Sequence, residues 1–311
     1  MKPALKAHLA LFVVNAFYGA NHILAKGVMP IYLTPNVFIA MRAVGATLLF
    51  WITKTFFIKE RIERKDLLRI AICGFFGVAN NQLFFFHGLS LSSSINASII
   101  MTLNPIMVAI LAYFILKESI GKVKFFGIVI GAVGAILLTL TAGTGKGDSI
   151  LGDFFLLINA LSYGIYLVTV KPLMQKYSPL TVITYVFTFG MCYVLLFPPT
   201  MRDILTTDFS AIPAGIWAKI IFVIVGVTFL VYLLTVYALK QLTASVSSTY
   251  IYMQPVMVIF FSYIFVVIGI SADFSTTITM EKLLYMLLIF TGVFLVINPK
   301  ILRKKSTKIE V

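Results

Sequence analysis

The stretch from Ile216 to Leu239, IWAKIIFVIVGVTFLVYLLTVYAL, determines the fold class expected of this chain. It carries a single charged residue, Lys219, and lacks the alternation of polar and apolar residues typical of a membrane β-strand. A second run, from Leu283 to Ile297, reads LLYMLLIFTGVFLVI and has the same character. Because a helix needs about 20 mostly apolar residues to cross the hydrocarbon core of a bilayer, both runs predict membrane-spanning helices.

The composition of the whole chain agrees with this interpretation. Of its 311 residues, 60% are hydrophobic and only 12% are charged, and the mean hydropathy is +1.01. Soluble domains carry about 25% charged residues, so this chain has too little charge to cover a water-exposed surface. Since backbone in lipid must satisfy its own hydrogen bonds, helices or a closed barrel are the only options. The sequence predicts an all-α integral membrane protein.

Ten transmembrane helices are predicted from the apolar runs and from the turn signals between them, such as Thr34-Pro35 and Ser178-Pro179. Their expected ranges are 5–27, 36–57, 67–88, 94–116, 122–141, 152–171, 180–198, 215–239, 243–268 and 280–298. Cys73 and Cys192 both fall inside these segments and are interpreted as small core hydrophobes rather than as a disulfide or metal ligands.

The basic residues predict the topology. The chain has a net charge of +14, and its 25 Lys and Arg residues lie mainly in short loops and at the chain ends. With the ten helices above, 19 of them fall on one side and five on the other, which leaves Arg42 inside a helix. Cytoplasmic loops are enriched in Lys and Arg, so both termini are predicted to be cytoplasmic. These charges point to lipid headgroups, not nucleic acid. The short loops and the single-domain layout predict a cell (inner or cytoplasmic) membrane.

An internal repeat is detectable in three pairs of helices. The matched pairs, at shifts of 145, 150 and 158 residues, include Tyr18 with Tyr163, Pro105 with Pro255, and Gly134 with Gly292. The sequence therefore predicts two related halves, residues 1–145 and 146–311, with five helices each. Because five is odd, the second half must cross the membrane in the opposite sense. Two inverted five-helix repeats are typical of secondary transporters.

One motif adds a family resemblance. The stretch from Leu103 to Ile110, LNPIMVAI, continues to Leu116-Lys117-Glu118 and resembles the Leu-x-Pro…Leu-x-Glu pattern of the drug/metabolite transporter (DMT) superfamily. Within that superfamily the chain is similar to the EamA-type ten-helix carriers. The resemblance covers the whole chain, with support from Arg42 and from Asn159-Ala160-Leu161-Ser162-Tyr163-Gly164.

The resemblance implies a bundle whose central cavity is lined by the first, third, fourth, sixth, eighth and ninth helices. It also implies export or exchange of small metabolites, such as amino acids or amphipathic compounds. Two departures limit the symmetry between the halves. The helix 180–198 has no counterpart of Arg42, and the helix 243–268 lacks the Lys-Glu pair that closes the helix 94–116.

Polar residues inside the predicted helices are candidates for the transport pathway, because polar groups in lipid are costly unless they face the bundle interior. Amides and tyrosines form stripes at helical spacing on the first and sixth helices, and amides cluster on the third. The alternative is that these groups join helices by hydrogen bonds. The predicted substrate-binding residues are Asn15, Tyr18, His22, Asn80, Asn81, Asn159, Tyr163, Tyr166, Tyr232 and Tyr252.

Two prolines are predicted hinges. Pro105 and Pro255 occupy equivalent mid-helix places, where each would remove a hydrogen bond and kink its helix. The alternative is a pair of static bends. Arg42 is the one cation well inside a predicted helix, and three roles are open for it: snorkelling to the headgroups, pairing with a helix C-terminus, or meeting an anionic substrate.

All eleven acidic residues fall in loops or at helix ends, which disfavours a strongly cationic cargo and favours neutral, zwitterionic or flat organic solutes. Proton coupling stays open, with His22 as the first candidate carrier and His87 as the second. No enzyme constellation, metal set or cofactor motif is found. We therefore expect a secondary transporter that works by alternating access on a small molecule, as a monomer or homodimer. A channel and a lipid-handling membrane protein are the alternatives.

Overall fold

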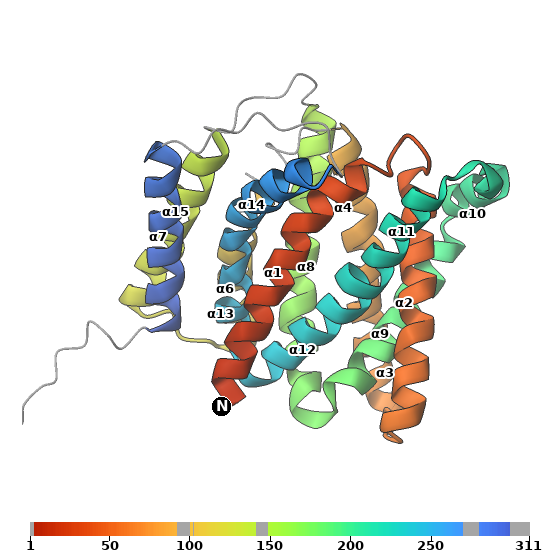
Figure 1. Cartoon of the computed structure of the whole chain (residues 1–311). Helices are drawn as coiled ribbons and strands as arrows, with labels where there is room; N and C mark the ends of the chain where they lie inside the picture. The colour runs from red at the N-terminus through yellow and green to blue at the C-terminus, as the bar shows by residue number, and fades with distance from the viewer. Residues whose placement is uncertain (1–2, 92–99, 102, 141–148, 270–279, 299–311) are drawn as a thin grey trace, which may run out of the picture.

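All regular structure in the described part of the chain is helical (Figure 1). The computed structural model describes residues 3–91, 100–101, 103–140, 149–269 and 280–298. The first half contains α1 (Pro3–Lys26), α2 (Pro35–Phe57), α3 (Arg64–Gly74), the π-helix η1 (Phe75–Ala79), α4 (Asn80–Leu91), α6 (Asn104–Leu116) and α7 (Lys122–Leu140).

The second half begins with α8 (Ile150–Lys176), α9 (Pro179–Leu196), α10 (Pro198–Thr206) and the 3₁₀-helix η2 (Phe209–Ala211). It continues with α11 (Ala214–Phe222), the π-helix η3 (Val223–Leu230), α12 (Val231–Gln241) and α13 (Ala244–Thr249). The 3₁₀-helix η4 (Tyr250–Met253), α14 (Gln254–Val267) and α15 (Met280–Ile297) follow. Each of the ten predicted segments overlaps helical residues, and the all-α prediction is confirmed.

Seven helical stretches in the described residues are long and apolar enough to cross a membrane. They are α1, α2, the continuous run from α3 to α4, α8, α9, the run from α11 to α12, and the run from α13 to α14. Asn104–Leu116 and Leu283–Ile297 are shorter apolar helices. The protein is therefore a multi-pass membrane protein, while the count of ten spans stays a prediction.

The turn signals act as helix caps, as expected. The Thr34 hydroxyl accepts a hydrogen bond from the Val37 amide at 3.4 Å, and Pro35 opens α2. The Ser178 hydroxyl accepts one from the Thr181 amide at 3.2 Å, and Pro179 opens α9. A Ser or Thr cap followed by proline suits a helix start, because the cap binds a free amide and proline lacks one.

Three of the long helices are interrupted, which the sequence did not predict. The π-helices η1 and η3 interrupt the third and eighth predicted helices, and η4 interrupts the ninth. Pro105 and Pro255 do not interrupt an α-helix from within, as was predicted, and their role as hinges stays a prediction. Each lies in the first turn of a helix, α6 or α14, where a missing amide removes no hydrogen bond.

Contacts between helices follow a regular scheme. Helix α1 packs on α12 and α14, and helix α8 packs on α4 and α6. Three further pairs join the first and second halves directly: α2 with α9, α6 with α13, and α7 with α15. The α7–α15 pair forms one edge of the bundle in Figure 1, and the two helices approach closely. A Cβ atom on Gly292 would lie only 2.4 Å from the Gly131 nitrogen.

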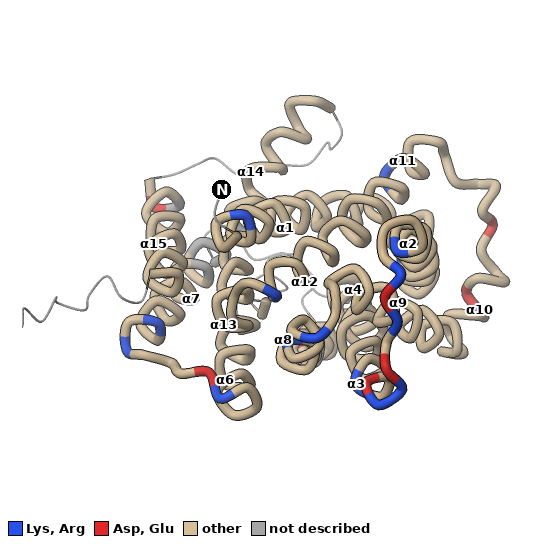
Figure 2. The backbone as a smooth tube through the Cα atoms, turned by 90° about the horizontal axis from the view of Figure 1, so that it is seen from below, with Lys and Arg blue, Asp and Glu red and all other residues tan. Residues whose placement is uncertain are grey.

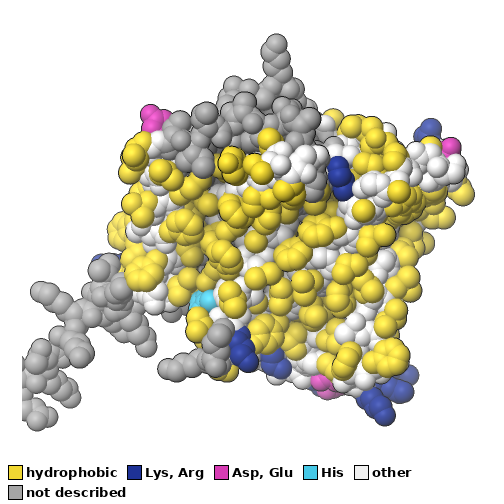
Figure 3. Space-filling view, in the orientation of Figure 1, with side chains coloured by type: hydrophobic (Ala, Val, Ile, Leu, Met, Phe, Trp, Pro, Cys, Tyr) yellow, Lys and Arg dark blue, Asp and Glu magenta, His cyan; other side chains and the backbone are white. Residues whose placement is uncertain are grey.

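The outer surface is largely apolar, as lipid contact requires. Large hydrophobic side chains are exposed on most helices, and they form the broad yellow surface of Figure 3. Cys73 is buried, as predicted for a core hydrophobe, whereas Cys192 lies exposed on α9, so the prediction was wrong for this residue. Helix α10 was not predicted either, because Pro198-Pro199 was interpreted as a turn.

Charged side chains concentrate at the two ends of the bundle. Seen from below, Lys and Arg mark loops and helix ends, including the segment between α2 and α3 (Figure 2). In that segment Glu60 accepts a hydrogen bond from the Ser178 amide at 2.9 Å, and Glu63 pairs with Lys176 at 2.6 Å. These contacts fasten the start of the α3 helix to the α8–α9 turn.

Candidate substrate site

A polar cavity lies between the two halves of the chain. The empty space between its side chains, the open mouth included, is about 590 Å³. Helices α1, α2, α4 and α6 contribute from the first half, and α8, α12, η4 and α14 from the second. The lining residues are Tyr18, Asn21, His22, Arg42, Asn81, Gln82, Phe85, Phe86, Met101, Asn104, Asn159, Tyr163, Tyr232, Ile251 and Gln254.

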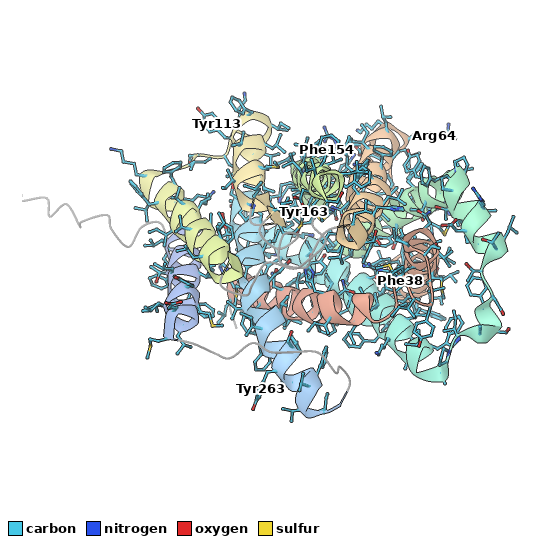
Figure 4. All side chains as sticks on the ribbon, turned by 90° about the horizontal axis from the view of Figure 1, so that it is seen from above. Phe38, Arg64, Tyr113, Phe154, Tyr163 and Tyr263 are labelled. Carbon is cyan, nitrogen blue, oxygen red and sulfur yellow. The ribbon has the colours of Figure 1, made fainter. Side chains whose placement is uncertain are left out.

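Six of the ten predicted substrate-binding residues line this cavity: Tyr18, His22, Asn81, Asn159, Tyr163 and Tyr232. Figure 4, seen from above, places Tyr163 toward the middle of the bundle and Tyr113 at its periphery. The side chain of His22 is 5% exposed, and its ring meets the Phe85 ring edge-on at 5.7 Å. The cavity therefore combines phenol, amide and imidazole groups, which suit polar organic solutes.

Two amides join α4 to α8 at the cavity wall. The Asn159 side chain donates to the Asn81 carbonyl at 2.7 Å, and the Asn81 side chain donates to the Asn159 carbonyl at 3.5 Å. Nearby, the Tyr232 hydroxyl donates to the Gly77 carbonyl at 3.1 Å. That carbonyl belongs to the π-helix η1, where the helical hydrogen-bond pattern changes. These residues both line the cavity and hold its wall together.

Two other predicted residues lie next to the cavity without lining it. Asn15 donates to the Leu11 carbonyl and accepts from the Gln254 amide at 3.2 Å, so it supports a lining residue of α14. Asn80 donates to the Ser162 hydroxyl at 3.0 Å and joins α4 to α8. Both fit the alternative of interhelical hydrogen bonding.

Tyr166 and Tyr252 point elsewhere. The Tyr166 ring packs where Gly77 has no side chain, and a Cβ there would lie 2.3 Å from the ring. The Tyr252 ring packs against Gly131 of α7 in the same way, at 2.6 Å from a Cβ built there. Both rings are fully buried, and neither lines the cavity. Neither ring reaches the cavity in this conformation, and contact of Tyr166 and Tyr252 with substrate stays a prediction.

Arg42 reaches the cavity from α2, a helix that the resemblance did not place among the lining helices. Its side chain is 3% exposed, and its Nε donates to the Thr228 hydroxyl at 3.0 Å. The guanidinium carbon lies 4.7 Å from the centre of the Phe86 ring and 5.6 Å from that of Phe38. Arg42 thus does not snorkel to the surface.

Several polar atoms in the cavity have no partner within the described part of the chain. They are Nη1 of Arg42, Oδ1 of Asn21, Oδ1 of Asn104, and both Oε1 and Nε2 of Gln82, and all four side chains are buried. Buried polar groups are nearly always hydrogen-bonded, so five such atoms in one cavity indicate room for a ligand or for water. Asn21 was not singled out from the sequence, although its place on α1 next to His22 was an available signal.

The remaining unpredicted lining residues are mostly apolar or lie near helix interruptions. Phe85, Phe86, Met101 and Ile251 resemble core residues in the sequence, and only the packing shows that they line a cavity. Gln254 opens α14 directly after the 3₁₀-helix η4. An amide at the centre of an apolar helix is the kind of signal that could have identified it.

A second charge with little solvent exposure, Glu118, lies at the end of the bundle where the α6–α7 turn meets the start of α13. Glu118 accepts hydrogen bonds from the Ala244 amide at 2.9 Å and the Ser245 hydroxyl at 2.7 Å. Lys124 lies 3.6 Å from the same carboxylate. A carboxylate at a helix N-terminus satisfies free amides and suits the helix dipole. We call Glu118, Lys124, Ala244 and Ser245 the Glu118 cluster.

A lysine closes the neighbouring helix end. The Lys171 ammonium of α8 donates to the carbonyls of Leu239 and Leu242, at the turn between α12 and α13. The Glu118 cluster and Lys171 therefore hold α6, α8, α12 and α13 together at the end of the bundle where α1 begins.

At the opposite end, a chain of hydrogen bonds joins α2 to α4 and α10. The His87 ring contacts the Asn36 side-chain oxygen at 2.8 Å, and Asn36 donates to Asp203 at 2.9 Å. The Thr34 hydroxyl donates to the same carboxylate at 2.8 Å. His87, the second candidate for proton coupling, thus belongs to a network outside the cavity lining.

Fold and cavity define a multi-pass membrane protein with a polar central chamber. The model of the EamA-like transporter family matches residues 5–140 and 150–298, and the chain belongs to this family. The predicted resemblance is therefore confirmed. Within the described residues no group of three or more His, Cys, Asp or Glu side chains could hold a metal ion.

Known relatives agree with the family. The chain is 29% identical over 265 residues to the uncharacterized transporter YyaM of Bacillus subtilis (strain 168), covering 83% of this chain and 86% of the relative. It is 23% identical over 197 residues to a probable terminal-alkyne amino-acid exporter of Streptantibioticus cattleyicolor, covering 63% and 64%. A crystal structure aligns over 93% of this chain and 95% of its own, with a TM-score of 0.71 and 15% identity, which concerns the fold alone.

Proposed function

We propose that the protein is a secondary transporter that exports or exchanges small organic metabolites, amino acids or related neutral and amphipathic solutes, by alternating access. The observation that carries this proposal is the central cavity, because helices of both halves line it and its polar groups are buried within an apolar bundle. We assign substrate contact to Tyr18, His22, Asn81, Asn159, Tyr163 and Tyr232. The probable amino-acid exporter among the relatives supports this solute class.

The same proposal includes ten spanning helices in two inverted repeats, residues 1–145 and 146–311. The packing supports it, because each helix–helix contact described above has an equivalent contact in which the helices of the two halves change places. Thus α1 on α12 and α14 corresponds to α8 on α4 and α6. In Figure 1, α1 and α8 run in opposite directions.

Local features support the repeat as well. The π-helices η1 and η3 interrupt counterpart helices, and proline begins both α6 and α14. Tyr113 and Tyr263, related by a shift of 150 residues, are both exposed and lie on opposite sides of the bundle in Figure 4. Pro105 and Pro255 begin α6 and α14, and these helix starts are the places where we propose that the chain bends during a transport cycle.

The Glu118 cluster suggests how one side of the cavity is closed. It joins the α6–α7 turn of the first half to α13 of the second half. For the cavity to open at the end where α1 begins, which we propose is the cytoplasmic end, these contacts must separate. A fully hydrogen-bonded contact between two halves is suited to a two-state gate.

The test of the proposed function is transport by the purified protein in proteoliposomes. Labelled amino acids should enter with saturable kinetics, and uptake should be faster when unlabelled solute is present on the opposite side. Asn81→Ala and Tyr163→Ala should each reduce uptake about tenfold or more, because each removes a group from the cavity wall. Tyr113→Ala, on the outer surface, is the matched control.

Three outcomes would overturn parts of this proposal. Currents in planar bilayers without stimulation by solute on the opposite side would indicate a channel. Movement of lipid, with no exchange of water-soluble solutes, would indicate a lipid-handling protein. Unchanged uptake by both Asn81→Ala and Tyr163→Ala would remove these residues from the site.

A further inference from the structure

Arg42 is a buried cation whose charge is left unmatched by the described residues around it. Its side chain is 3% exposed, and no Asp or Glu is among the residues that line the cavity. Moving a cation out of water costs several kcal/mol unless an opposite charge and hydrogen bonds compensate. A site that keeps such a charge in place, next to empty space, is suited to a ligand that brings the opposite charge.

The contacts of Arg42 fix the guanidinium and leave part of it free. Nε donates to the Thr228 hydroxyl at 3.0 Å, and that hydroxyl itself donates to the Val223 carbonyl at 2.9 Å. The guanidinium carbon lies over the Phe86 ring at 4.7 Å. Thr228 therefore holds the Nε edge of the guanidinium and Phe86 covers one of its faces, whereas Nη1 has no partner within the described part of the chain. A guanidinium held in this way presents donors in a fixed direction.

Hydrogen-bond acceptors complete the cavity. The side-chain oxygens of Asn21, on α1, and Asn104, on α6, line the same space and have no partner among the described residues. Both side chains are more than nine-tenths buried. An amide oxygen accepts hydrogen bonds, so these two groups suit an amino or hydroxyl group on a ligand.

We propose that the transported solute is an organic carboxylate, that Arg42 binds its carboxylate group, and that Asn21 and Asn104 accept hydrogen bonds from a donor group of the same solute. This inference rests on the proposed transport function and names the substrate class of that site. An Arg–carboxylate pair is strong and directional, because two parallel N–H···O bonds can form.

The pairing also has a consequence for the transport cycle. An empty cavity holds an uncompensated positive charge, whereas the loaded cavity is neutral at Arg42. The loaded protein therefore has a lower electrostatic cost when its cavity is closed off from water. An uncharged amide of the same shape would bring no such compensation, so the site discriminates between an acid and its amide.

The test uses matched acids and amides with the full-length protein in detergent. The probes are L-leucine with L-leucinamide, L-phenylalanine with L-phenylalaninamide, and 3-phenylpropionate with 3-phenylpropionamide. Ligands that bind the folded protein raise its melting temperature by mass action. We expect the acid of at least one pair to raise the melting temperature, and its amide to raise it much less at the same concentration.

Variants of Arg42 then locate the effect. Arg42→Gln should weaken binding of the effective acid by about 30-fold or more, as expected when one partner of a buried charge pair is removed. Arg42→Lys keeps the positive charge but not the two parallel donors of the guanidinium, and it should weaken binding of the acid less than Arg42→Gln does. Arg202→Gln, an exposed arginine of α10, is the matched control and should bind as the unmodified protein does.

Each other outcome contradicts the proposal. Equal stabilisation by acids and amides, stabilisation by amides alone, or no stabilisation by any acid would overturn the carboxylate assignment. Unchanged acid binding by a folded Arg42→Gln protein would remove Arg42 from the site. Saturable uptake of amides in proteoliposomes would support the proposed transport function and contradict the carboxylate assignment. No saturable uptake of any solute would contradict the transport function itself.

Discussion

Two charges with little solvent exposure, Glu118 and Arg42, have opposite surroundings. Glu118 is held by the Ala244 amide, the Ser245 hydroxyl and Lys124, so the fold itself compensates its charge. Arg42 has the Thr228 hydroxyl and two aromatic rings, and its Nη1 is without a partner in the described residues. Removing one partner of a charge that the fold compensates is costly, whereas an uncompensated buried charge itself costs stability; we propose that Arg42 is retained for a ligand.

The largest effect on stability is expected for Glu118→Ala. This change leaves Lys124 without its partner and removes the acceptor at the start of α13. Breaking a buried ion pair by removing one partner costs about 3 kcal/mol or more. The free energy of unfolding in detergent should fall accordingly. Glu281→Ala, an exposed acid of α15, is the control, and an equal loss in both variants would contradict the comparison.

A smaller effect is expected for Ser245→Ala, because the Ala244 amide and Lys124 remain as partners of Glu118. A hydrogen bond to a charged group contributes about 2 kcal/mol. The control is Ser262→Ala, whose hydroxyl donates only to the Val258 carbonyl in its own helix. Thermal unfolding of both variants should show the greater loss for Ser245→Ala, and the reverse order would show that the Glu118 cluster does not stabilise the fold.

Arg42→Met should have no destabilising effect in the absence of ligand. Methionine is unbranched and apolar, so it can replace the stem of Arg42 while removing the cost of a buried charge. We expect a melting temperature equal to or above that of the unmodified protein. A loss as large as that of Glu118→Ala would mean that Arg42 is compensated within the fold and serves structure alone.

A small loss of stability is expected from the acids between α2 and α3, of which Glu60 is half-buried and Glu63 exposed. Burial, the largest single influence, tends to raise the pKa of Glu60, but hydrogen bonds from the Ser178 amide and from the Thr181 and Ser178 side chains, together with the charge of Lys240, lower the net pKa. The pKa of Glu63 is lowered by its contacts with Lys176 and Lys65. A carboxyl group whose pKa is lower in the native than in the unfolded protein stabilises the fold at pH values above its unfolded pKa, near 4.3. This stabilisation is lost as the pH falls through the native pKa.

Glu60→Gln should therefore melt at a slightly lower temperature than the unmodified protein at pH 7. The difference should vanish when Glu60 becomes protonated in strongly acidic solution. Melting curves between pH 7 and acid would measure it. A difference that grows on acidification would contradict the sign given by the lowered pKa.

Much of the fold could be predicted because membrane helices are set by local sequence. Long apolar runs, and caps such as Thr34-Pro35, fix where helices begin and end without reference to their neighbours. Helix α10 was missed because Pro198-Pro199 can open a helix as well as end one. The π-helices η1 and η3 were missed because they depend on packing, whereas η4 lies directly before Pro255, where a kink was predicted.

The candidate site could be predicted only in part, because an apolar helix in lipid has no polar face to mark its inward side. Neighbouring residues on a helix point about 100° apart, so Asn81 lines the cavity while Asn80 bonds to Ser162. Tyr163 and Tyr166 share one stripe, yet Tyr166 is drawn into the space left by Gly77. Which residue meets the cavity is thus decided by the partner helix.

Arg42 was recognised in the sequence as a cation inside a helix, but its role could not be chosen without the neighbouring helices. From the sequence, headgroup contact, a helix end and an anionic substrate were all open. The structure buries the side chain and places it against Phe86 and Thr228, inside the cavity lining. The absence of a carboxylate among the described cavity residues agrees with the sequence, which places the acids in loops or at helix ends, whereas the burial of Arg42 depends on the neighbouring helices.

The most direct measurement is an experimental structure of the protein with the acid that raises its melting temperature most. We predict density for the carboxylate within about 3 Å of the Arg42 guanidinium nitrogens, as in charge-assisted pairs. An acid bound away from Arg42, or an Arg42 paired with a carboxylate of the protein itself, would contradict the account.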